Sequence, residues 1–423
     1  MHNLLNFILR SVLGLVALAL VGIIGFGLYI YSRYEAIPDF SVQPKPVIRT
    51  AAPAFAEAIR ASRLDMEAIR RAKYYPSMSI SVVRLGEEVW SEAVGYEDLK
   101  TRKSATPDTL YPSGSIAKAL TGVLAMQLAS EGVVDLDAPI NLYATDLPTT
   151  YEGVTLRQLL SHQAGVRHYK ATLTPPYFSE NGLNREFGGV GDSLSIFIDD
   201  ELLFEPDASF QYSTFGYTLA SYVLEKATGV SFLDLIRDRL LNSISADQIV
   251  PDRSGRPNPN RTTDYISALQ NVGVFRSPPT NVSYKWAGGG FLSSPSALAQ
   301  FGDLMLRGEI LDAPSIAEMT TPRRMANGEI NPQRYGIGWR VSDIRLADGV
   351  DTIPVYHHGG TAVGAECALL LAPSFDLSIS ICGNAFTGGS GDLIRLARSV
   401  ARHIQHDALL QESNDTHRDA LTE

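Results

Sequence analysis

Cysteine is scarce in this chain, and basic side chains are fewer than acidic ones. Only two cysteines, Cys367 and Cys382, occur among 423 residues, which excludes a disulfide-built scaffold and a zinc site made of thiolates. The 36 lysines and arginines stand against 46 aspartates and glutamates, for a formal net charge of -10. A nucleic-acid surface needs clustered basic side chains that neutralise phosphates. We therefore expect no nucleic-acid partner.

The two cysteines lie in segments whose patterns predict neighbouring strands, joined by a turn at residues 373–376. In such a hairpin Cys367 and Cys382 face each other. We expect two small buried hydrophobic side chains there, with a disulfide as the alternative.

Charge is absent from residues 11–31, a run long enough to cross about 30 Å of hydrocarbon as a helix. The apolar run continues into Tyr29, Tyr31 and Tyr34, which is typical of an interfacial aromatic belt and not of a small-residue cleavage site. We expect an uncleaved, single-pass membrane anchor. Since only ten residues precede the run, we place residues 1–10 in the cytoplasm and the remainder on the extracytoplasmic (periplasmic) side.

The rest of the chain divides into a Pro-bearing linker and helix (32–75), one large domain (76–406) and a polar tail (407–423). We expect the linker to hold the domain off the bilayer and residues 411–423 to be frayed. The Pro-, Asn-, Arg- and Ser-rich residues 251–283 predict a long surface excursion.

The large domain has strand patterns at both ends and helical patterns between them. Alternating apolar residues over 78–94 predict a β-hairpin, and three further strands are expected at 355–356, 366–372 and 377–382. Apolar residues at helical spacing predict helices at 115–131, 156–161, 215–228, 232–241, 294–307 and 393–406. This order predicts an α/β (α+β) fold with a mostly antiparallel sheet flanked by helices, and an all-α region inserted between the second and third strands.

The candidate chemistry begins with Ser115 and Lys118, three residues apart where an apolar helix starts. That spacing places the hydroxyl and the amine on one face. The partial positive charge of the helix N-terminus favours a serine alkoxide and disfavours an ammonium. Lowering a lysine pKa from about 10.4 to a value useful for a base costs roughly 3 to 5 kcal/mol, which requires burial. Ser-x-x-Lys is a short pattern and weak evidence by itself.

Two further segments carry candidate site residues. Tyr212 precedes a helical pattern and could act as a proton relay to Ser115 and Lys118, although taken alone it is more typical of a packing tyrosine. The run Tyr356-His357-His358-Gly359-Gly360-Thr361 ends a strand in glycines, which allow close approach of a substrate. The backbone N–H groups of Ser115 and Gly360 could form an oxyanion hole.

Together the three segments resemble the penicillin-binding-type serine hydrolases, in particular the class C β-lactamase and esterase branch. Ser115-Ile-Ala-Lys118 matches the Ser-x-x-Lys motif, Tyr212-Ser213-Thr214 the Tyr-x-Asn element, and His357-His358-Gly359 the Lys/His-x-Gly element. The likeness extends over residues 77–403. The runs at 159–169 and 212–217 are most similar to the mitochondrial serine β-lactamase-like proteins and their bacterial relatives.

The resemblance implies a β-lactamase/transpeptidase-like fold and a serine hydrolase that cleaves a small peptide, ester or amide through an acyl-enzyme. It assigns catalytic roles to Ser115, Lys118, Tyr212 and His357, and substrate contacts to Thr214, His358 and Gly359. It implies neither a metal nor a cofactor, and it makes a homo-oligomer possible. The alternatives are a catalytically idle binding or scaffold protein on the same fold, and a D,D-carboxypeptidase or true β-lactamase.

The chain departs from the family pattern at two positions that bear on the substrate. Thr214 stands where an amide side chain is usual, which puts β-lactam turnover in doubt. Glu366 stands where a small residue is common. We expect its carboxylate, beside the weakly basic His357, to disfavour substrates that carry a carboxylate.

Overall fold

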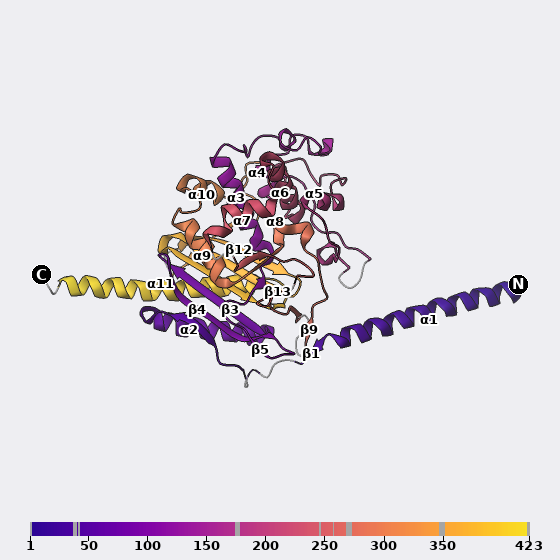
Figure 1. Ribbon diagram of the computed structural model, residues 1–423, viewed down its shortest axis with the longest axis horizontal. Coiled ribbons are helices and arrows are strands. Elements are labelled where there is room, and N and C mark those ends of the chain that lie inside the picture. The colour runs from indigo at the N-terminus through magenta and orange to yellow at the C-terminus, as the bar shows by residue number, and fades with distance from the viewer. Residues whose placement is uncertain are drawn as a thin grey trace.

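The computed structural model describes residues 2–36, 40, 43–173, 178–244, 247–256, 258–267, 273–346 and 352–420, with the backbone alone for 2–5 and 411–420. Figure 1 shows a globular body from which a helix projects at each end of the chain. The N-terminal helix α1 (His2–Ser32) contains one candidate membrane span, Asn6–Tyr31, none of which is buried against the body. A signal segment and an anchor share this length and composition.

The body is built on an eight-stranded sheet with the order β11-β12-β13-β14-β3-β4-β2, in which β5 (Lys103–Ser104) also pairs with β4. All neighbouring pairs are antiparallel. The predicted hairpin is β3 (Ser77–Arg84) and β4 (Glu87–Asp98). Because β14 pairs with β3, the two ends of the domain complete one sheet, which confirms the predicted fold class.

Three of these strands were predicted near the end of the domain. They are β12 (Thr352–Ala362), β13 (Ala365–Ala372) and β14 (Leu377–Gly383). A fourth, β11 (Arg340–Arg345), was not predicted.

Both faces of the sheet are covered, so β13 is buried along its whole length. Ala368 and Leu370 face a core shared with α2 (Ala56–Lys73) and α11 (Gly391–Ala420). Cys367 and Leu369 face the opposite core, which contains helices α3 and α9. This double coverage explains why β13 reads as a continuous apolar run and not as an alternating one.

The helical region lies between β4 and β11 and covers the second face (Figure 1). Its central helix, α3 (Ala117–Ser130), is buried on nearly all sides, as its all-round apolar sequence predicts. Helix α9 (Pro295–Leu306) begins as predicted, with Ser294 Oγ accepting from Ala297 N at 3.2 Å and Pro295 in the first turn. The other helices of the region are α4 (Leu156–Leu160), α5 (Val190–Ser193), α6 (Thr214–Thr228), α7 (Phe232–Arg239), α8 (Trp286–Gly289) and α10 (Ala313–Met319).

The segment predicted as a linker contains secondary structure that the sequence patterns did not indicate. Two strands lie in it, β1 (Tyr34–Glu35) and β2 (Val47–Ala51), and β2 forms an edge of the large sheet. Strand β1 pairs with β9 (Val274–Arg276), which lies in the predicted surface excursion. The excursion therefore contributes strands to small sheets: β9 and β8 (Tyr265–Ile266) to one, and β7 (Ile249–Pro251) to another.

Two smaller expectations are also corrected. Helix α11 continues through Ala420, so the described part of the tail is helical. Cys367 and Cys382 are paired residues of β13 and β14 and form a disulfide, where we favoured two unbonded thiols. Both are nonetheless fully buried, as expected.

Candidate active site

Ser115 sits on a tight turn between β6 (Tyr111–Pro112) and α3, in the 3-10 helix η2 (Gly114–Ile116). Strand β12 lies directly against this turn, and two glycines make the contact possible. A Cβ on Gly360 would lie 1.8 Å from Ser113 O, and one on Gly114 would lie 2.7 Å from Thr361 N. Gly114 also has a φ of +52°, a conformation that other residues rarely adopt. The turn and the strand are therefore held together at the nucleophile.

Lys118 is fully buried, and its amine contacts three oxygen atoms. Nζ lies 3.2 Å from Ser115 Oγ, 3.1 Å from Thr214 Oγ1 and 2.6 Å from Gly288 O. The carbonyl of Gly288 can only accept a hydrogen bond. A neutral amine that donates to Gly288 O and Thr214 Oγ1 keeps its lone pair for the Ser115 hydroxyl. The geometry thus fits a base that accepts the serine proton.

Burial holds the pKa of Lys118 well below its ordinary value, and the positive charge of Arg340 lowers it further. Glycines allow close packing around Lys118: a Cβ on Gly288 would lie 2.5 Å from Thr214 Cγ2, and one on Gly338 would lie 2.7 Å from the backbone oxygen of Lys118. The two residues predicted as nucleophile and base are therefore brought together, with the amine fully buried.

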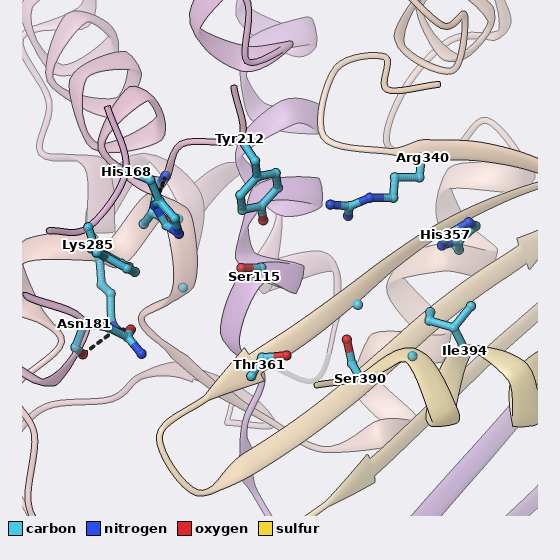
Figure 2. A pocket seen from close by; sticks show the side chains of 16 residues that line it. Ser115, His168, Asn181, Tyr212, Lys285, Arg340, His357, Thr361, Ser390 and Ile394 are labelled. Carbon is cyan, nitrogen blue, oxygen red and sulfur yellow. Dashed lines mark hydrogen bonds between the residues drawn. The ribbon is translucent and has the colours of Figure 1, made fainter. Parts of the chain in front are cut away.

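Tyr212 lies just before α6, with its hydroxyl directed toward Ser115 (Figure 2). Burial raises the pKa of Tyr212, while Arg340 and the hydrogen bond with Ser115 act in the opposite direction. Lys118 Nζ lies 4.9 Å from the centre of the Tyr212 ring. The tyrosine is thus close to both members of the Ser115–Lys118 pair, as the relay prediction requires.

Two histidines fix the chain at Tyr212. His162 Nδ1 accepts from Ser213 N at 3.1 Å, and His168 Nδ1 accepts from Thr214 N at 3.2 Å. Burial lowers the pKa of His162 well below its ordinary value and that of His168 to about 3. Both rings are therefore neutral at physiological pH, with the proton on Nε2. His162 thus bonds the segment that leads into α6.

The two histidines of β12 have different surroundings. His357 lines the cavity, and burial together with Arg398 and Arg340 lowers its pKa to about 3, so it is neutral there. His358, predicted to contact substrate, is fully buried and is not among the residues that line the cavity. Its Nε2 lies 3.0 Å from Tyr335 Oη, and its Nδ1 donates to Gly359 O at 2.7 Å.

The site opens into a cavity of about 410 Å³. Of the predicted residues, Ser115, Tyr212, Thr214, His357 and Gly359 line it. Side chains that the sequence did not single out as site residues also line it: His168, Tyr169, Asn181, Lys285, Arg340, Thr361, Ser390 and Ile394. No aspartate or glutamate is among these lining residues.

Arg340 is one of the missed residues near the predicted chemistry. It is the first residue of β11, opposite His357. Its Nε and Nη2 donate to Gln333 Oε1 at 2.9 and 2.6 Å. Its guanidinium lies 5.2 Å from the ring centres of both Tyr212 and Tyr335. Nothing in the local sequence distinguishes it from a solvated arginine at the start of a strand.

The expected effect of Glu366 on substrates is wrong, because its carboxylate does not reach the cavity. Glu366 is fully buried and accepts hydrogen bonds from the hydroxyl of Tyr75, from Thr387 N at 2.8 Å and Oγ1 at 2.9 Å, and from Gly389 N at 2.7 Å. These hydrogen bonds hold the loop before Ser390 in place. Glu366 therefore does not oppose an anion in the site.

The fold that brings Ser115, Lys118 and Tyr212 together agrees with the family comparison. The beta-lactamase family model matches residues 65–402. The chain belongs to the beta-lactamase family. Among its relatives in this family, the mitochondrial serine beta-lactamase-like protein LACTB of Mus musculus is 28% identical over 411 residues, with 76% of this chain and 74% of the relative covered. Protein flp of Staphylococcus aureus strain MW2 is 27% identical over 175 residues, covering 40% of this chain and 34% of flp.

Solved structures share the fold at lower identity. The D-amino acid amidase from Ochrobactrum anthropi SV3, complexed with L-phenylalanine amide, has a TM-score of 0.68 at 20% identity, covering 84% of this chain and 99% of that one. The octameric penicillin-binding protein homologue from Pyrococcus abyssi has a TM-score of 0.66 at 22% identity, covering 80% and 76%. These likenesses show the fold of this chain.

Proposed function

We propose that this chain is a membrane-anchored serine hydrolase that cleaves an amide or ester bond through an acyl-enzyme on Ser115. The observation that carries the proposal is the 3.2 Å contact between Lys118 Nζ and Ser115 Oγ at a fully buried amine. An exposed ammonium could not accept the serine proton. A buried lysine without a carboxylate partner costs folding free energy, which is hard to explain for an idle scaffold.

In the proposed reaction, Ser115 Oγ transfers its proton to Lys118 and attacks the carbonyl carbon. The backbone N–H groups of Ser115 and Gly360 stabilise the resulting oxyanion. Tyr212 relays the proton to the leaving group, and water then hydrolyses the acyl-enzyme. Thr214 supports this cycle by holding Lys118, to which its hydroxyl is bonded at 3.1 Å.

Neutral His357 and the backbone at Gly359 contact the substrate in this proposal as hydrogen-bonding groups and not as charges. Amides are favoured among the possible substrates because a neighbour with the same fold is a D-amino acid amidase. An octameric neighbour makes a homo-oligomer a reasonable expectation.

We further propose that residues 11–31 of α1 anchor the protein, with residues 1–10 in the cytoplasm and the domain outside. The apolar span Asn6–Tyr31 supports the anchor. The Cys367–Cys382 disulfide supports an oxidising, extracytoplasmic compartment, since such bonds are rare in the cytosol.

Covalent labelling tests the proposed nucleophile. We expect a fluorophosphonate to add one adduct to the intact chain, and the adduct to be lost in Ser115→Ala. Ser130→Ala is the matched control, because Ser130 lies at the far, exposed end of the same helix. An unlabelled wild-type chain would favour the idle scaffold. Release of D-Ala from D-Ala-D-Ala peptides, or nitrocefin hydrolysis, would instead identify a D,D-carboxypeptidase or a β-lactamase.

A further inference from the structure

A second lysine enters the active-site cavity. Lys285 ends the 3-10 helix η8 (Ser283–Lys285), immediately before α8, whose Gly288 carbonyl accepts from Lys118. Figure 2 shows Lys285 beside Asn181 and His168, with Ser115 and Tyr212 between it and Arg340. Lys285 is 5% exposed, so its amine is inside the protein and faces the cavity that it lines.

The groups that contact the amine of Lys285 carry no charge. Its Nζ donates to Asn181 Oδ1 at 2.8 Å and to Asn181 O at 3.3 Å. The rings of Tyr169 and Tyr284 lie 5.4 and 5.1 Å away. No carboxylate of the described residues is within ion-pair distance of the amine. An ammonium has three N–H donors, so Asn181 leaves one for the cavity.

Folding stability does not explain a cation in this position. A buried charge without a counter-ion is unfavourable, and burial together with nearby Lys118 lowers the pKa of Lys285 to about 7. Asp252 opposes this shift without forming an ion pair. A methionine would fill the same space between the two tyrosines without the cost. The amine is therefore better explained by a ligand that supplies the missing negative charge.

The cavity as a whole favours an anion. Lys285 and Arg340 lie on opposite sides of Ser115, and the residues that line the cavity include no acid. The cavity is thus lined by cations although the chain as a whole has a formal net charge of -10. The carboxylate of Glu366, which could have opposed an anion, is held elsewhere by Tyr75, Thr387 and Gly389.

We propose that Lys285 and Asn181 form a subsite for a carboxylate carried by the substrate, so that the amides or esters cleaved at Ser115 bear an anionic substituent. The proposal rests on the proposed hydrolase function. One N–H of Lys285 and the amide N–H of Asn181 match the two oxygens of a carboxylate. Lys285 is thus a specificity-determining residue, distinct from the base Lys118.

Two pairs of esters test the subsite, each pair differing only in one charge. The first is p-nitrophenyl glutarate and its methyl ester, with the carboxylate on the acyl half. The second is the acetate ester of 3-hydroxybenzoate and that of methyl 3-hydroxybenzoate, with the carboxylate on the leaving group. We expect the wild-type full-length chain to prefer the charged member of one pair. For that pair, we expect Lys285→Met to lower the ratio of kcat/KM for the charged ester to kcat/KM for the neutral ester by about 10-fold to 100-fold, mainly through KM.

Lys285→Arg should retain part of that preference, and Lys226→Met should leave it unchanged because Lys226 is an exposed residue paired with Asp146. An equal ratio in wild type and Lys285→Met for both pairs would overturn the subsite. Circular dichroism of each variant establishes that it is folded.

Binding separates this inference from the hydrolase proposal. In a Ser115→Ala background, calorimetry with p-nitrophenyl glutarate and with the acetate ester of 3-hydroxybenzoate should show binding that Lys285→Met weakens about 10-fold or more. Lys285-dependent binding without wild-type turnover would reject the hydrolase and retain the subsite. Turnover that depends on Ser115, together with binding that Lys285→Met does not weaken, would support the hydrolase proposal and reject the subsite. Absence of both turnover and binding would reject both.

Discussion

The hydrogen bonds of Lys118 determine which protonation state the site can use. Gly288 O and Thr214 Oγ1 take its two N–H groups when the amine is neutral, which leaves the lone pair for Ser115. The same burial that makes the amine neutral at Lys118 acts on Lys285, where the pKa falls to about 7. In the proposed enzyme the two buried lysines therefore have different roles, Lys118 as a base and Lys285, which lines the cavity, as a partner for an anion.

Removing the base should abolish most activity. We expect Lys118→Met to lower kcat/KM for a neutral ester by about 10² to 10⁴, the usual contribution of a positioned acid or base. The variant should still fold, because methionine removes an uncompensated buried amine. Steady-state kinetics check this, with Lys226→Met as the surface control. Retention of near wild-type kcat/KM would show that another group accepts the proton.

The pH profile gives an independent check on Lys118. The active form is the neutral amine, and burial lowers the pKa of Lys118 well below its ordinary value. The rise of kcat/KM for a neutral ester with pH, after subtraction of the Ser115→Ala background, should therefore lie at lower pH than an ordinary lysine would give, and the slope between pH 7 and 9 should be shallower. A lysine with an ordinary pKa would instead give a rise of about tenfold per pH unit over this range.

At the scale of elements, the site depends on the contact between β12 and the turn that begins α3. Gly360 and Gly114 allow backbone to meet backbone there, and Lys118 is packed against the backbone at Gly338. The disulfide joins β13 to β14, and Cys367 is the partner of Gly360 in the neighbouring strand. Ser115 thus lies against a strand that is itself paired along seven residues with β13.

A side chain at this contact should be poorly tolerated. In Gly360→Ala the new Cβ would lie 1.8 Å from Ser113 O, so the strand or the turn must move. We expect a loss of about 100-fold or more in kcat/KM, because small displacements of a catalytic group are costly. Gly189→Ala is the matched control, since a Cβ there meets nothing within 4 Å. Kinetics and thermal melting of both variants measure the effect, and equal behaviour would contradict the packing argument.

At the scale of the whole molecule, α1 is connected to the body without a free spacer. Arg33 Nη1 donates to Ser277 O at 2.9 Å, and Tyr34 and Glu35 pair with Phe275 and Val274 of β9. The end of the apolar helix is therefore fixed to the small sheet of the body. In the proposed membrane-anchored protein, this connection limits how far the domain can turn relative to the bilayer.

Deletion of residues 1–32 tests the anchor. We expect the shortened chain to move from the membrane fraction to the supernatant after carbonate extraction, and to keep its Ser115-dependent activity within about twofold, because α1 is not buried against the body. Deletion of residues 1–46 also removes β1 and its pairing with β9, and should lower the melting temperature further. A shortened chain that stays in the membrane would contradict the assignment of residues 11–31.

The sequence alone determined the features that depend on short spacing. Ser115 and Lys118 are one helical turn apart, so their contact follows from helix geometry. The Ser294 cap and the buried α3 likewise follow from local patterns. The mostly antiparallel sheet was predicted from strand patterns at both ends of the domain with helical patterns between them.

Tertiary structure alone decided what else lines the site and what charge it carries. Lys118 and Gly288 are 170 residues apart, and Lys285 and Asn181 are 104 apart, so no local pattern relates them. Glu366 was expected to repel a substrate carboxylate, but the donors of Tyr75 and Thr387 hold it away from the cavity. Burial and long-range packing set the pKa of a side chain and the direction in which it points, and neither is encoded in neighbouring residues.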